Sequence, residues 1–163
     1  MKSKRATVGA PSTTSAEAQL ESFLAKYNPE IARDARECHS ILRSLVPGAV
    51  EMVYDNYNAL VIGFSPSERA SEAILSIAVM PRWVDLCFVQ DASTLPDPLG
   101  LLKGSGKVAR HIVLESPRDL DKPSVRALLT VALERARVPI DPGATSRLII
   151  KSISAKQRPR RPS

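Results

Sequence analysis

The stretch LPDPLGLLKGSGKVARHI, Leu95–Ile112, holds three glycines, two lysines, an arginine and a histidine. Glycine amides beside a lysine are the groups that cradle phosphate in nucleotide-binding loops. A Walker loop needs a further glycine five positions before its Gly-Lys pair and a serine or threonine after it. Leu101 and Val108 occupy those two positions here. The sequence therefore does not predict triphosphate binding of that kind.

The same loop could still bind a smaller anion. Backbone amides around Gly104 and Gly106 can form a concave nest, and cationic side chains lie on both sides of it. The candidate side chains are Lys103, Lys107, Arg110 and His111. Neighbours on a strand point to opposite faces, so only one of Arg110 and His111 can join a given pocket. The alternative is a plain glycine turn whose cations face water.

A second group of polar side chains lies in EMVYDNYN, Glu51–Asn58. A turn rich in Asn and Asp is expected for backbone reasons alone. Two tyrosines beside it, with a tryptophan on a nearby strand, could instead line a small-molecule or peptide pocket. The candidate pocket residues are Tyr54, Asp55, Asn56, Tyr57 and Trp83.

Soft metal ligands are few, because the only cysteines and histidines are Cys38, His39, Cys87 and His111. Adjacent residues on a helix diverge by about 100°, so Cys38 and His39 cannot face one ion together. No zinc-ligand spacing is present. Both cysteines lie in apolar segments and are expected to be buried and unpaired. The sequence indicates no cofactor, no resident metal and no catalytic residue.

Helical periodicity frames these groups at both ends of the chain. Ser15 is expected to cap a helix that runs to about Tyr27, and Asn28-Pro29 to start a second one that ends at Pro47-Gly48. A third amphipathic helix is predicted over Arg118–Val138.

Between the helices the hydrophobic period changes from 3.6 to about 2. Four short runs rich in Val, Ile and aromatic residues, VEMVYD, ALVIGF, AILSIAVM and WVDLCFV, predict an antiparallel meander. Val108–Glu115 is expected to add a fifth strand, and Arg147–Ser154 one further short strand. The fold class that follows is α+β: a mainly antiparallel sheet of about five strands covered by N-terminal and C-terminal helices.

The charge lies at the ends of the chain. The net charge is +6, and the lysines and arginines of residues 1–15 and 155–163 more than account for it. Those segments are expected to be disordered basic tails around one domain over residues 16–154. Within that domain, the half after residue 94 carries the excess of base, where an anion would be attracted. The N-terminus resembles no secretory signal and no apolar run could span a membrane, so a cytoplasmic location is expected.

Three features together resemble the YdhG-like family of uncharacterised bacterial domains. They are E-x-x-Y at Glu51–Tyr54, the segment Leu95–Ile112, and D-x-P-x-V-R-x-L at Asp121–Leu128. The similarity covers roughly residues 20–137 and implies one α+β domain, mostly without assigned activity. One branch of the family is described as a frataxin-like intracellular iron chaperone. Many members carry Y-G-x-P after the glutamate, where this chain has Tyr54-Asp55-Asn56-Tyr57.

Three functional hypotheses follow. The first is a non-enzymatic domain that binds a small molecule or anion between the sheet and Gly104–His111. The second is iron binding on the acidic face of the helix after Pro29, where Glu30, Asp34 and Glu37 lie among arginines. The third is weak, non-specific contact of the basic tails with nucleic acid.

Overall fold

The computed structural model describes residues 15–162 and confirms the α+β class. Three helices, α1, α2 and α3, accompany one six-stranded sheet in the order β6-β5-β4-β3-β2-β7. The helices are α1 (Ala16–Leu24), α2 (Pro29–Leu45) and α3 (Pro123–Glu134). The strands are β2 (Val50–Asp55), β3 (Leu60–Ser65), β4 (Leu75–Val79), β5 (Val84–Phe88), β6 (Arg110–Leu114) and β7 (Arg147–Ile153). Short 3₁₀ turns lie at η1 (Ala70–Glu72), η2 (Ala92–Thr94) and η3 (Pro117–Asp121).

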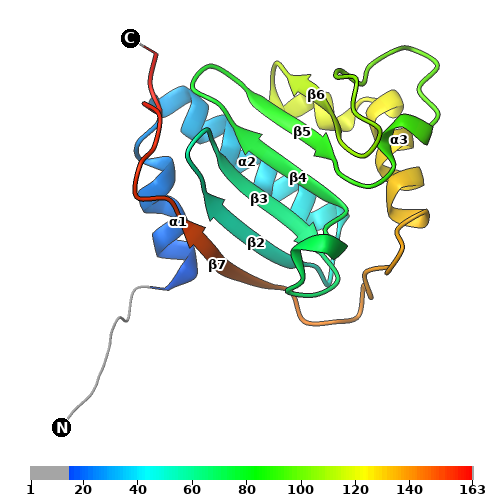
Figure 1. The fold of residues 1–163 in the computed structure, drawn as a ribbon, viewed down its shortest axis with the longest axis horizontal. Helices are drawn as coiled ribbons and strands as arrows, with labels where there is room; N and C mark the ends of the chain where they lie inside the picture. Colours follow the sequence, from blue (N-terminus) through cyan, green and yellow to red (C-terminus); the bar gives the residue numbers. More distant parts are fainter. Residues whose placement is uncertain (1–14, 163) are drawn as a thin grey trace, which may run out of the picture.

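Strands β2 to β6 form the expected antiparallel meander. The final strand, β7, returns across the molecule and pairs with β2 in parallel, which makes β7 and β6 the two edges of the sheet. Figure 1 shows these edges on opposite sides of the sheet.

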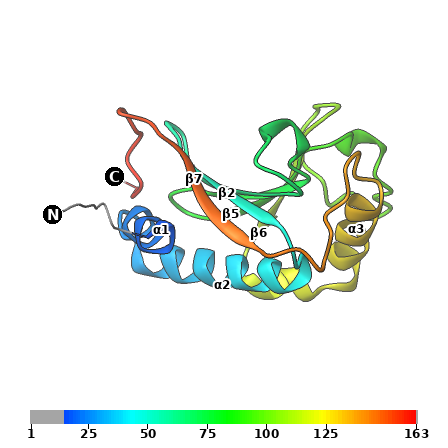
Figure 2. The same cartoon turned by 90° about the horizontal axis from the view of Figure 1, so that it is seen from below.

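Helices α1 and α2 cover one face of the sheet, and Figure 2 shows them side by side beneath it. Alternate strand residues point to this face and form the core with the helices; Leu60, Ile77 and Leu86 are each fully buried there. Ser15 caps α1 as expected, accepting a hydrogen bond from the amide of Ala18. No α-helix of residues 15–162 covers the opposite face of the sheet (Figure 2).

Two helix predictions were partly wrong. The helix expected over Arg118–Val138 is divided into η3 and α3, because Lys122 precedes Pro123 and is extended, with ψ 134°. A residue before proline avoids the α conformation, so the helix restarts with Pro123 at its first position. Asn28 precedes the first turn of α2 as expected, but its side chain makes no cap hydrogen bond.

The C-terminal segment does not behave as a free tail. Residues 155–162 run beside α1 (Figure 1), and the Arg160 side chain is buried there. The prediction of a disordered C-terminal tail was therefore wrong for these residues, because a buried carboxylate holds them in place. The predicted N-terminal tail lies, except for Ser15, outside the described residues.

Candidate functional site

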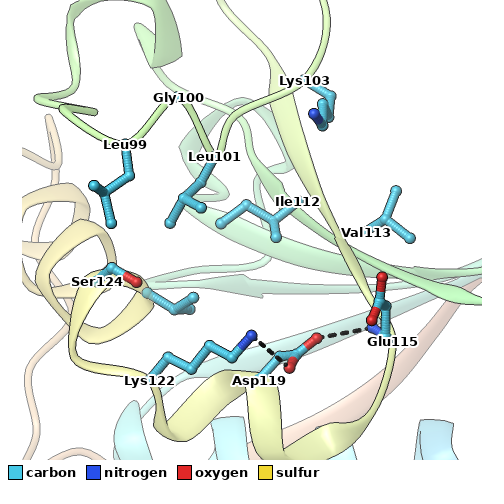
Figure 3. Close-up of a pocket in the computed structure, with 11 residues that line it drawn as sticks. Leu99, Gly100, Leu101, Lys103, Ile112, Val113, Glu115, Asp119, Lys122 and Ser124 are labelled. Atoms are coloured by element: carbon cyan, nitrogen blue, oxygen red, sulfur yellow. Dashed lines mark hydrogen bonds and ion pairs between the residues drawn. The ribbon is translucent and has the colours of Figure 1, made fainter.

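The candidate site is a cavity at the β6 edge with a volume of about 430 Å³. The segment 99–103 forms one wall, β6 the second, and η3 with the start of α3 the third (Figure 3). Its apolar lining comes from Leu99, Leu101, Ile112, Val113 and Val125. Its charged lining comes from Lys103, Glu115, Asp119 and Lys122.

The charged groups of this cavity are of two kinds. Lys122 Nζ lies 3.2 Å from Asp119 Oδ1, so these two charges compensate each other. Lys103 and Glu115 are exposed, and neither side chain has an ion-pair partner within residues 15–162. Figure 3 shows Lys103 at one end of the cavity and the Asp119–Lys122 pair at the other, with the apolar side chains between them.

The outer wall of the cavity is shaped by one carboxylate. Asp97 accepts hydrogen bonds from the amides of Leu101 at 2.8 Å and Leu102 at 2.9 Å. Beyond them, Lys103 and His111 bond each other through both backbone groups, N–H to C=O in each direction. The chain therefore touches the β6 edge at Lys103 and stands away from it before that residue.

The predicted glycine loop lies next to this cavity but does not line it. Gly104 has φ +103°, a conformation that glycine adopts without strain, and Gly104, Gly106 and Lys107 are all exposed. Arg110 Nε donates to the carbonyl of Gly106 at 2.8 Å, so the loop offers an acceptor to this arginine. These contacts favour the turn over the anion nest. The residue that the cavity does use, Lys103, directly precedes Gly104.

Arg110 and His111 do point to opposite faces of the sheet. His111 pairs with Cys87 across the strands, on the face without helices. The Cys87 thiol is not activated by this neighbour, because burial raises its pKa to about 11. Burial likewise raises the pKa of Cys38 to about 12. Both thiols are unpaired and protonated at neutral pH.

The residues of EMVYDNYN lie in two different environments, an exposed hollow and the buried core. Asn56 and Tyr57 line a shallow hollow of about 400 Å³ over the β2–β3 turn, and neither Tyr54 nor Trp83 contributes to it. Tyr54 points to the helix-free face, whereas Asp55 points to the helical face and is fully buried. The sheet order places two strands, β4 and β5, between this turn and the strand β6 that follows the glycine loop. The structure therefore does not bring the ten predicted site residues into one pocket.

Asp55 is instead the centre of a buried ionic cluster. Its Oδ2 accepts from Lys26 Nζ at 2.7 Å and its Oδ1 from Arg160 at 2.9 Å, while Gln157 bonds its backbone carbonyl. Burial opposes ionisation of Asp55, but the hydrogen bonds from Lys26, Gln157 and Arg160 outweigh it and lower the pKa. The cluster fastens the C-terminal segment to the sheet. The isolated sequence gave no signal for it, since Asp55 and Arg160 are 105 positions apart.

A second buried cluster joins α2 to β2. Glu51 accepts from His39 Nε2 at 2.7 Å and from two nitrogens of Arg43, at 2.9 and 2.7 Å. Burial disfavours the charged form of Glu51, but the bonds from Arg43 and His39 lower its pKa overall. His39 is thus a partner of a core carboxylate, and Cys38 beside it packs in the core. Glu51, the first residue of the E-x-x-Y motif, therefore has a structural role.

Neither alternative hypothesis gains a site from this geometry. Within residues 15–162 no group of three or more His, Cys, Asp or Glu side chains could hold a metal ion. The acids named for iron, Glu30, Asp34 and Glu37, are on α2 and belong to no such group. On α1, Glu21 bonds Arg36 of α2, and Glu17 bonds Arg43 of α2. Of the C-terminal cations, Arg160 is buried against Asp55 and cannot contact nucleic acid in this arrangement.

No protein-family model, curated protein or solved structure matches the chain. The resemblance to the YdhG-like family stays a prediction from the residues. Within the described part of the chain, every helix is too short or too polar to cross a membrane. Fold and site together define an α+β domain with an open cavity at one sheet edge.

Proposed function

We propose that this protein is a non-enzymatic binding domain that holds a small carboxylate or similar anion with an apolar body in the β6-edge cavity. Its volume of about 430 Å³ is within the range of small-molecule sites, roughly 300–1,000 Å³. Such sites combine apolar walls with a few polar groups that orient the ligand. The observation that carries the proposal is Lys103, an ammonium group beside apolar walls and without an acidic partner among residues 15–162.

Two further features support binding rather than chemistry. Both cysteine thiols are protonated because of burial, which removes the most reactive nucleophiles of the chain from covalent catalysis. Residues 95–137, which include every residue that lines the cavity, also contain more lysines and arginines than aspartates and glutamates, so their net positive charge favours the approach of an anion.

The test is calorimetric titration of the full chain with pentanoate and, separately, with inorganic phosphate. Lys103→Gln removes the charge in the cavity, and Lys107→Gln removes a charge in the adjoining exposed loop as a matched control. We expect Lys103→Gln to weaken carboxylate binding about two- to fivefold, the effect of one partly exposed ion pair. Lys107→Gln should leave it unchanged. The proposal fails if wild type binds neither probe, or if Lys107→Gln alone weakens binding.

A further inference from the structure

Among residues 15–162, one position on the outer edge of β6 has backbone groups without a hydrogen-bond partner, and it is Val113. In an antiparallel ladder the backbone groups of successive residues alternate between the two neighbouring strands. His111 bonds Lys103 through both its N–H and its C=O, so its backbone faces away from β5. Two residues later the N–H and C=O of Val113 face the same way. The next outward group, the amide of Glu115, is already bonded to Asp119 Oδ2 at 2.9 Å.

This open position faces the cavity. Asp97 holds the amides of Leu101 and Leu102, so the segment that pairs with β6 at Lys103 cannot continue to Val113. The result is a wedge between two chain segments, with one backbone donor and one backbone acceptor on its β6 side. An unpaired rung of this kind is a template for another extended chain.

The flanking charges give the template a direction. Lys103 lies at the His111 end of β6 and Glu115 at the opposite end, and Val113 is between them. A chain that pairs antiparallel with β6 has its carboxyl end beside Lys103 and its amino end beside Glu115. The two unpaired charges therefore complement the two free ends of a very short peptide.

We infer that the cavity binds a dipeptide unit with free ends, paired antiparallel with Val113. This inference rests on the proposed function and names its ligand class. The amide N–H of the dipeptide donates to the Val113 carbonyl, and its carboxylate accepts from the Val113 amide and from Lys103. Its ammonium group lies beside Glu115. No bond is made or broken.

The pleat also sets a side-chain preference. Directly opposite residues of two paired strands share a face, so the C-terminal side chain of the dipeptide lies beside Val113 on the helix-free face. The preceding side chain points to the other face, where Ile112 and Leu101 line the cavity. The first residue of the dipeptide should therefore be apolar.

The experiment titrates full-length protein with Leu-Val, with the same dipeptide methylated at its peptide nitrogen, and with pentanoate. We expect Leu-Val to bind more tightly than pentanoate, and methylation to weaken it about two- to tenfold, the effect of one lost hydrogen bond. Val113→Pro removes the outward N–H without touching a ladder bond, so it should weaken Leu-Val as well. The methylated ligand tests the same contact without changing the protein, which covers a failure of this variant to fold.

The outcomes separate the two proposals. Equal affinity for Leu-Val and its methylated form overturns the pairing with Val113, while carboxylate binding through Lys103 can still stand. Pentanoate binding as tight as Leu-Val also overturns it. If the wild-type protein binds none of the three ligands, the proposed function and the dipeptide inference are both wrong.

Discussion

On the β2 and β7 side of the sheet, Asp55 is fully buried and bonded by Lys26 and Arg160, whereas at the β6 edge Lys103 and Glu115 are exposed and have no ion-pair partner within residues 15–162. A buried charge is tolerated only where partners replace its lost hydration. An exposed charge keeps its water and can exchange it for a ligand. The Asp55 cluster therefore stabilises the fold, and the β6 edge, with its unpaired charges, is where we propose that a ligand binds.

The largest expected effect is on the buried side. Asp55→Ala leaves Arg160, itself buried, without its carboxylate partner. Removing one member of a buried pair costs about 3–5 kcal/mol of unfolding free energy. Urea denaturation should show this loss. Asn58→Ala, in the exposed turn that follows β2, should change the free energy of unfolding by less than about 0.5 kcal/mol. If Asp55→Ala lowers the free energy of unfolding by less than about 1 kcal/mol, the Asp55 cluster does not hold the C-terminal segment to the sheet.

Acid should weaken the buried clusters next. The pKa values of Asp55 and Glu51 are lower in the folded protein than in the unfolded chain. Their stabilisation is therefore complete above about pH 5 and is lost as the pH falls through the folded pKa values, below about pH 4. Urea midpoints between pH 7 and pH 3 should fall accordingly, and less steeply in Asp55→Asn. A midpoint that does not change over this range would contradict the prediction.

Local patterns in the sequence predicted most of the elements. Ser15 before an apolar period of 3.6 gave the start of α1, and the four apolar runs gave the meander with its order. Patterns that depend on distant partners did not. Nothing near RPRRPS indicates that Arg160 is buried, since its partner Asp55 belongs to another element. Composition described this segment as a tail because composition contains no information on pairing.

The sequence predicted the region of the candidate site, but of the side chains it named only Lys103 lines the cavity. The stretch Leu95–Ile112 contains both Lys103 and the Asp97 that holds the wall open. Gly104 and Gly106 were predicted because glycine amides can bind an anion, but in the structure they form an exposed turn. Asp97 between two prolines was the usable signal, because aspartate in a turn commonly bonds amides further along the chain. The open rung at Val113 could not be predicted, since it depends on the pairing of His111 with Lys103.

The smallest change tests how the β6 edge is kept open. Asp97→Ala frees the amides of Leu101 and Leu102, and the Lys103–His111 pairing can then extend by two residues, which places Leu101 opposite Val113. We expect slower hydrogen exchange at the Val113 amide and weaker ligand binding, with a stability change of about 1–2 kcal/mol or less. Ser105→Ala, exposed in the next loop, is the control. Exchange at Val113 as fast as in the wild type would mean that Asp97 does not hold the wedge open. The contrast between a fastened edge and an open one would then rest on the exposed charges alone.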